Sequence, residues 1–271
     1  MREDKYEFEV GKKGQEGLDI LDVMFNDNTQ QHILSAGLKP GFRVLDIGCG
    51  RGAMSVWFAS QVGKNGKVVA IDNSENQINA TTELTKNIAP TWLTFKVHSA
   101  YDIDKLNLNF DMVYCRFILH HVNNPTLIIE KVFNLLSPGG IFIAEEGVVS
   151  AAFTYPKISA WGRERLENPL PLDKEGEDRD GNFGMKLFHQ MKTVGFEVTH
   201  ASLYQPLLYT SQHKQLLGGA SREGFKEYSL AHGMTLSEWE KQEKELDKLI
   251  ADPAGCIGFY QSCLVVGKKG N

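Results

Sequence analysis

The sequence predicts an α/β fold with a doubly wound, mostly parallel sheet. Strand-like and helix-like segments alternate from Arg43 to Glu145, and a glycine-rich turn joins the first strand of this series to its first helix. This alternation requires helices on both faces of a parallel sheet, because each helix returns the chain to the start of the next strand. The chain has 271 residues, 42% hydrophobic and 23% charged, which is the composition of an ordinary globular protein with a sizeable core.

The alternating region supplies five expected strands. Each is a short apolar run rich in β-branched residues and bounded by turn or helix signals. They cover Arg43 to Ile47, Lys67 to Ile71, Trp92 to Val97, Phe110 to Cys115 and Ile141 to Glu145. Helices are expected at Ala53 to Val62 and at Ser74 to Asn87. A further helix starts with Asn124 as its N-cap and Pro125 in its first turn.

The flanking segments are less regular. Residues 1–37 predict a helical segment with an apolar stripe from Leu18 to Phe25 and a short second helix that stops at Gly37. Residues 151–271 predict a helical lid together with the last two strands of the same sheet. The expected elements there are helices at Ala151 to Leu166 and Gly184 to Thr193, strands at Glu197 to Gln205 and Ile257 to Val266, and, between these strands, a helix opened by the capping box Thr235 to Glu238.

Composition excludes several classes of function. There are 29 Lys and Arg against 34 Asp and Glu, so a net charge of −5 disfavours nucleic acid as a partner. The four cysteines form no C-x-x-C pair and match neither a zinc site nor a secreted disulfide framework. The first ten residues lack the apolar core of a signal peptide, and no stretch is apolar enough to span a membrane. We therefore expect a cytoplasmic protein without stable membrane insertion.

The glycine-rich turn predicts a nucleoside site. Gly48, Gly50 and Gly52 follow a strand and open a helix, where glycines allow a close approach of the backbone and the helix N-terminus offers unpaired N–H groups. Asp72 ends the next strand, roughly 20 residues further on, where a carboxylate can accept hydrogen bonds from both ribose hydroxyls. The glycines alone are also compatible with a plain tight turn. Gly48, Gly50 and Ala53 also satisfy the dinucleotide pattern, so spacing alone does not choose between cofactors.

Four motifs in order resemble those of class I S-adenosylmethionine-dependent methyltransferases. They are Val44 to Gly52 with Asp46 two residues before the first glycine, Val69 to Asp72, Phe110 to Val113, and Leu136 to Gly140. The stretch Cys115 to Pro125, with its His120–His121 pair, is similar to the small-molecule enzymes of the ubiquinone/menaquinone-biosynthesis group. The resemblance implies a Rossmann-like sheet of seven strands whose last strand is antiparallel, with residues 38–150 as the cofactor-binding core.

The resemblance also implies which residues bind S-adenosylmethionine and its product S-adenosylhomocysteine. Asp46, Gly48, Cys49 and Gly50 would hold the methionine end. Asp72 would bind the ribose and Asn73 the adenine edge. Ser99 and Ala100 stand where the family usually has an adenine-binding aspartate. Arg116 either contacts the cofactor carboxylate or has a structural role.

The chemistry predicts methyl transfer by in-line displacement to a small, partly apolar acceptor. Alignment of two reactants contributes up to about 7–11 kcal/mol, so a base matters only when the acceptor must lose a proton. Candidates for that base are His120, His121, Glu145 and Glu146. A histidine packed in the core and a glutamate in a salt bridge with Arg116 or Arg163 are at least as simple interpretations. Adjacent histidines are poorly placed to share an ion, so no metal is expected.

Three questions stay open from the sequence. Aromatic residues could wall the acceptor or simply pack the lid; they are Phe153, Tyr155, Trp161 and Phe183. A nicotinamide-dependent oxidoreductase and a non-catalytic cofactor-binding protein are the alternative functions, and the first would need a Tyr-x-x-x-Lys pair that the sequence lacks. The acceptor's identity, the methylated atom and the oligomeric state cannot be read from the sequence.

Overall fold

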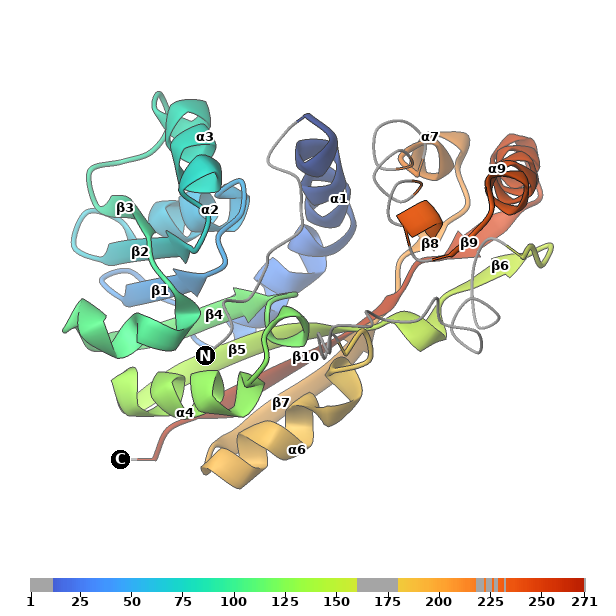
Figure 1. The fold of residues 1–271 in the computed structure, drawn as a ribbon. Helices are drawn as coiled ribbons and strands as arrows, with labels where there is room; N and C mark the ends of the chain where they lie inside the picture. Colours follow the sequence, from blue (N-terminus) through green and yellow to red (C-terminus); the bar gives the residue numbers. More distant parts are fainter. Residues whose placement is uncertain are drawn as a thin grey trace.

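The computed structural model describes residues 12–159, 180–217, 222, 226, 229–231 and 233–270. Its main feature is the expected seven-stranded sheet, with strand order β3-β2-β1-β4-β5-β10-β7 (Figure 1). The strands are β1 (Arg43–Ile47), β2 (Lys67–Asp72), β3 (Leu93–Val97), β4 (Phe110–Arg116), β5 (Leu136–Val148), β7 (Glu197–Tyr204) and β10 (Gln261–Lys268).

The direction of the strands confirms the expected topology. β1 pairs in parallel with β2 and β4, β2 with β3, and β4 with β5. β10 is antiparallel to both of its neighbours, β5 and β7. The order of the strands reverses between β1 and β4, and in open α/β sheets a crevice forms at the carboxyl ends of the strands at such a point. The fold therefore predicts a binding site above β1 and β4.

Helices cover both faces of the sheet (Figure 1). α1 (Lys12–Ser35), α2 (Ala53–Val62) and α3 (Glu75–Thr85) pack on one face around Phe58 and Tyr114. The other face carries the 3-10 helix η1 (Ala100–Leu106), α4 (Pro125–Leu135) and α6 (Gly184–Val194), which surround a second core that includes Phe142. Within the described residues, no helix is long and apolar enough to cross a membrane.

The N-terminal segment differs from expectation because it forms one helix. The sequence predicted two, but α1 runs from Lys12 to Ser35 without a break. No glycine or proline follows Gly17 within this helix, and Phe25 and Ile33 are both fully buried, so the apolar stripe continues across the predicted gap. The predicted stop is confirmed, since Gly37 has a φ of 107° just past the helix end.

The region predicted to be a mostly helical lid also contains a small sheet, which was not predicted from the sequence. The short strands β6 (Phe153–Tyr155), β9 (Cys256–Gly258) and β8 (Leu207–Leu208) form an antiparallel sheet in the order β6-β9-β8. The helix predicted over Ala151 to Leu166 is thus wrong for residues 151–159, none of which is α-helical, and its remainder from residue 160 lies outside the described residues. Pro156 disfavours a helical conformation at Tyr155, and the β-sheet formers before it pair with β9 instead.

A second correction concerns the end of the chain. The strand predicted over Ile257 to Val266 is two strands, β9 in the small sheet and β10 in the main sheet. Phe259 and Tyr260 connect them, and the N–H of Phe259 donates to the carbonyl of Pro206. The chain passes from one sheet to the other at this point, which an unbroken apolar run could not reveal. The break directs Tyr260 toward the carboxyl end of the main sheet.

Helices α7 (Ser211–Gln215) and α9 (Leu236–Ala251) complete the described part of the lid. The predicted capping box opens α9, with reciprocal hydrogen bonds between Thr235 and Glu238. Lys214 of α7 is fully buried, and its ammonium group donates to the carbonyl of Leu249 in the last turn of α9 and to those of Asp252 and Gly255 just after it. A cation placed on these carbonyls satisfies the helix C-terminus and fixes the two helices together.

Candidate functional site

The glycine-rich turn after β1 is shaped by positive φ angles. Gly48 has a φ of 72°, Gly50 of 49° and Gly52 of 77°. The N–H groups of Gly48 and Cys49 both donate to the carbonyl of Ile71 at the end of β2, at 2.8 and 2.9 Å. A Cβ atom on Gly48 would lie 2.0 Å from Cδ1 of Ile118. Only glycine therefore fits between the turn and the loop that follows β4.

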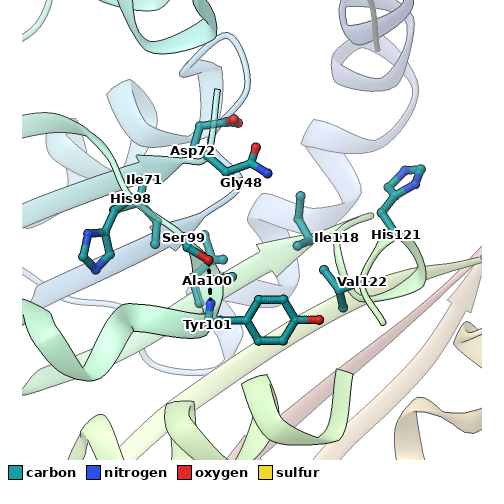
Figure 2. Close-up of a pocket in the computed structure, with 12 residues that line it drawn as sticks. Gly48, Ile71, Asp72, His98, Ser99, Ala100, Tyr101, Ile118, His121 and Val122 are labelled. Atoms are coloured by element: carbon teal, nitrogen blue, oxygen red, sulfur yellow. Dashed lines mark hydrogen bonds between the residues drawn. The ribbon is translucent and has the colours of Figure 1, made fainter. Parts of the chain in front are cut away.

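A first cavity of about 60 Å³ lies beside this turn (Figure 2). Its lining residues are Ile47, Gly48, Ile71, Asp72, Asn73, His98, Ser99, Ala100, Tyr101, Ile118, His121 and Val122. The carboxylate of Asp72 accepts hydrogen bonds from the N–H of Ser74 at 3.0 Å and the N–H of Gly50 at 3.4 Å. Burial raises the pKa of this carboxyl, and the backbone donors work against that rise.

The far wall of the first cavity follows β3. The Oγ atom of Ser99 accepts a hydrogen bond from the N–H of Tyr101 at 3.2 Å, drawn as a dashed line in Figure 2. Ser99 is the N-cap of η1, so its hydroxyl stabilises the start of that helix, and the residue also lines the cavity. The carboxylate of the nearby Asp102 pairs with Lys105 at 2.9 Å and is not among the residues lining the cavity. Among these lining residues, Asp72 supplies the carboxylate.

A second cavity of about 220 Å³ shares Gly48, Ile118 and His121 with the first. Its walls come from α1, the glycine-rich turn, the end of β4 and the turn between β9 and β10. The remaining lining residues are Leu21, Asp22, Asp46, Cys49, Gly50, Arg51, Ala53, Met54, Tyr114, Arg116, Phe117, His120, Gly147, Val149, Gly181 and Tyr260. The two cavities are thus adjacent, and we refer to them together as the two-part site, which lies across the carboxyl ends of β1, β2 and β4.

Asp46 lies at the floor of the second cavity and is 2% exposed. Its carboxylate accepts a hydrogen bond from the hydroxyl of Ser55 at 2.5 Å. Burial raises the pKa of Asp46 to about 6, while the Ser55 hydrogen bond and the positive charge of Arg116 work against the rise. Such a carboxylate favours a cationic group in the cavity, because a cation would offset the cost of its burial.

Arg116 is bound by the N-terminal helix. Its guanidinium group donates to Asp22 at 2.9 Å and to Asn26 at 2.8 Å, both on α1. The next residue, Phe117, has a positive φ of 55°, which is an uncommon conformation for a bulky residue. This conformation turns the chain sharply after β4. Arg116 therefore ties α1 to the end of β4 and lines the second cavity at the same time.

His120 and Glu146 form a buried pair. Nδ1 of His120 lies 2.6 Å from Oε2 of Glu146, whose other oxygen accepts the N–H groups of Ile118 at 2.9 Å and Leu119 at 2.7 Å. The Glu146 side chain is fully buried, and His120 lines the second cavity. The rings of His120 and His121 lie 3.8 Å apart, between centroids. Three hydrogen bonds thus fix the carboxylate that orients His120.

The neighbouring Glu145 points to the opposite face of the sheet. It accepts a hydrogen bond from Thr29 of α1 at 2.6 Å, and its other oxygen has no hydrogen-bond partner. The sequence also allowed a salt bridge from one of these glutamates to Arg116 or Arg163. Within the described residues, Arg116 pairs with Asp22 and not with Glu145 or Glu146. Arg163 lies outside the described residues.

The sequence leaves two interpretations open for the aromatic residues, an acceptor wall or packing of the lid, and the structure does not favour a wall for Phe153, Tyr155 or Phe183, which line neither cavity. Trp161 lies outside the described residues. Phe183 packs in the core, and Phe153 and Tyr155 are 44% and 71% exposed on the small sheet. The aromatic rings that do line the second cavity are Tyr114, Phe117 and Tyr260. Tyr260 stacks on Phe25 with 5.7 Å between ring centroids. Tyr114 and Phe117 lie at the end of β4, whereas no spacing in the sequence connects Tyr260 to them, because it lies in the turn between β9 and β10.

The structure brings the predicted site residues together. All of the candidates for cofactor binding line one cavity or the other, as do His120 and His121. Glu146 lies behind His120 rather than on the surface of a cavity. Sequence reasoning missed Leu21, Asp22, Tyr114, Ile118 and Tyr260. Alternation along β4 could have placed Tyr114 on the same face as Arg116, whereas no local signal points to Tyr260.

Solved structures define the class of fold. The chain is similar to an S-adenosylmethionine-dependent methyltransferase from Aquifex aeolicus, with a TM-score of 0.51, 16% identity, and coverage of 70% of this chain and 92% of that one. It is also similar to phosphoethanolamine N-methyltransferase 2 of Haemonchus contortus, with a TM-score of 0.58, 16% identity, and coverage of 96% of this chain and 58% of that one. The fold is therefore that of the Rossmann-like S-adenosylmethionine-dependent methyltransferases.

The sequence identifies the family. Residues 38–203, more than half of the chain, match the methyltransferase domain family, and the chain belongs to it. Relatives include a ubiquinone/menaquinone biosynthesis C-methyltransferase of Hydrogenovibrio crunogenus, 31% identical over 45% of this chain and 49% of that protein. A ubiquinone biosynthesis O-methyltransferase of Xanthomonas axonopodis is 34% identical over 51% of this chain and 56% of that protein. The chain thus matches about half the length of these relatives. None of these comparisons favours the oxidoreductase alternative.

Proposed function

We propose that this chain transfers a methyl group from S-adenosylmethionine to a small, partly apolar acceptor. The observation that carries the proposal is the two-part site, in which two cavities meet at Gly48, Ile118 and His121. The first cavity carries a buried carboxylate, Asp72, and apolar walls, which suit a nucleoside. The second carries charged groups and a histidine, which suit an amino-acid group and a reacting centre.

The residues present fit this cofactor. The ribose hydroxyls would bind Asp72, whose oxygens accept backbone hydrogen bonds and, with about two acceptor sites on each oxygen, retain capacity for more. Asn73, Ser99 and Ala100 would contact adenine. The methionine end would bind at Asp46, Gly48, Cys49, Gly50 and Arg116. The missing Cβ of Gly48 leaves room for the Ile118 side chain, which packs against the glycine-rich turn where the linings of the two cavities meet.

The cofactor supplies a methyl group on a positively charged sulfur, which is displaced in line by the acceptor atom. The protein's contribution is to align the two reactants and to exclude water, and positioning of this kind is worth up to about 7–11 kcal/mol. Phe117, Val149 and Tyr260 give the acceptor side of the second cavity its apolar surface. A cavity of about 220 Å³ suits a small acceptor or the reacting end of a larger one.

His120 is the proposed general base. Because Glu146 occupies Nδ1, the other ring nitrogen, Nε2, is the one that can accept a proton from an acceptor in the second cavity. Glu146 acts through His120 as a positioning residue, as carboxylates paired with histidine do in other active sites. His121, at the junction of the cavities, is a second candidate for contact with the reactants.

The proposal is tested by transfer of labelled methyl from S-adenosylmethionine to panels of phenols, quinols and amines. We expect label in at least one small acceptor, and a loss of about 10²–10⁴-fold in His120→Ala. His189→Ala is the matched control, since His189 is exposed on α6, and its activity should stay unchanged. Tight binding of S-adenosylhomocysteine without transfer to any acceptor would favour the non-catalytic alternative.

A further inference from the structure

Tyr114 has an unusual position between the core and the second cavity. It lies on β4 beside Asp46 of β1 in the parallel register, so the two side chains share the α1 face of the sheet. Its ring packs edge-on against Phe58 at 5.4 Å between centroids, within the core beneath α2. The residue is only 2% exposed, yet it lines the second cavity. The ring therefore belongs to the core, and the buried hydroxyl lies at the wall that the core shares with the second cavity.

The hydroxyl of Tyr114 has no hydrogen-bond partner. Buried hydroxyl groups almost always have one, so an unpaired one calls for a ligand or a structural cause. Its charged neighbours are Arg116, two residues along β4, and the carboxylates of Glu145 and Asp46. Burial raises the pKa of Tyr114 well above its ordinary value, so the hydroxyl keeps its proton. It can therefore donate to a carboxylate and accept from an ammonium group.

We propose that the Tyr114 hydroxyl binds the amino-acid end of the cofactor, next to Asp46 and Arg116. This inference rests on the proposed function, and it adds a contact that the sequence motifs did not indicate. An amino-acid group carries an ammonium and a carboxylate. The floor of the second cavity offers an anion, a cation and a neutral hydroxyl side by side in Asp46, Arg116 and Tyr114. The unpaired hydroxyl gains its partner when that group binds.

Tyr114→Phe tests the inference because it removes the hydroxyl and keeps the ring. Calorimetry would measure binding of S-adenosylhomocysteine and of 5′-methylthioadenosine, which has the same nucleoside thioether but no amino-acid group. We expect the affinity for S-adenosylhomocysteine to fall about tenfold, the effect of one lost hydrogen bond to a charged group. The affinity for 5′-methylthioadenosine should stay unchanged, and the melting temperature of the free protein should not fall.

Tyr204→Phe is the matched control. Tyr204 also packs in an aromatic cluster, against Phe25, but it lines neither cavity. Its variant should bind both ligands as the wild type does. The inference is overturned if Tyr114→Phe leaves S-adenosylhomocysteine binding unchanged, or weakens both ligands equally while lowering the melting temperature. Failure of the wild type to bind either ligand would instead overturn the proposed function itself.

Discussion

Glu146 holds His120 through a contact of 2.6 Å between Oε2 and Nδ1. The carboxylate is fully buried, and its second oxygen accepts two backbone N–H groups from the turn that precedes the histidine. The same side chain therefore shapes the turn after β4 and selects which ring nitrogen of His120 carries the proton. This pair connects the last parallel strand of the sheet to the proposed reacting centre.

Glu146→Gln should reverse the tautomer of His120. The amide oxygen can keep the backbone donors of Ile118 and Leu119, which leaves the NH₂ group facing Nδ1 and makes that nitrogen an acceptor. The proton then moves to Nε2, and the base is lost. Long-range ¹H–¹⁵N NMR should show the Nδ1–H form in the wild type and the Nε2–H form in the variant. Glu130→Gln, on the exposed side of α4, should show the wild-type pattern.

Gly48→Ala should abolish cofactor binding. The new Cβ would lie 2.0 Å from Cδ1 of Ile118, at a φ of 72° that alanine rarely adopts. Either the turn or the loop after β4 must move, and both shape the junction of the cavities. Binding of S-adenosylhomocysteine, followed by calorimetry, should become undetectable at concentrations that saturate the wild type.

Two further variants distinguish the collision of the new Cβ with Ile118 from the backbone strain that alanine has at a positive φ. Gly41→Ala has a comparable φ of 89° with nothing within 4 Å, so it should lower stability by about 1–2 kcal/mol and leave binding intact. The double variant Gly48→Ala with Ile118→Ala removes the two closest contacts and should recover part of the affinity. Equal binding by Gly48→Ala and the wild type would show that the cofactor does not bind at this turn.

Asp46 should make the protein less stable as the pH rises through the weakly acidic range. Its pKa in the folded protein is about 6, above the ordinary value of 3.8, so the folded state binds this proton more tightly than the unfolded state does. Stability from this group is therefore full below pH ~4 and lost by pH ~6, a change of about 3 kcal/mol. Urea unfolding of the wild type and Asp46→Asn between pH 4 and pH 7 measures the difference.

The asparagine of Asp46→Asn cannot titrate. The free energy of unfolding of the variant, measured relative to that of the wild type, should therefore increase as the pH rises. The hydroxyl of Ser55 can still donate to the amide oxygen, which keeps the local geometry. Parallel pH curves for the two proteins would contradict the unfavourable burial of an ionised Asp46.

Local signals in the sequence predicted the main sheet and the nucleoside side of the site. Apolar runs and helix starts can be predicted because they depend on residues close together in the sequence. The signal Asn124–Pro125, for example, correctly predicted the start of α4. Gly48 and Asp72 lie at the ends of adjacent strands, so strand order alone brings them together. Residues that directly follow parallel strands all lie at the same edge of the sheet, so their place in the site can be predicted from the sequence.

The parts that could not be predicted depend on distant contacts. Arg116 is held by Asp22 and Asn26, about 90 residues earlier in the chain, and no pattern connects them. Tyr260 reaches the cavity only because the chain changes sheets between β9 and β10. The strand at residues 153–155 forms because β9 is available to pair with it, which overrides the helical periodicity of the segment.

We propose that the two-part site binds S-adenosylmethionine through Asp72 and its neighbours. The decisive measurement is calorimetric titration with S-adenosylhomocysteine and, in parallel, with NAD, using Asp72→Ala as the site variant. Asp111→Ala is the control, since Asp111 pairs with Arg43 at the amino ends of β4 and β1, away from the site at the carboxyl ends of these strands. We predict micromolar binding of S-adenosylhomocysteine, weakened by about 1–3 kcal/mol in Asp72→Ala alone, and no binding of NAD. Binding of NAD alone, or unchanged affinity in Asp72→Ala, would contradict the account.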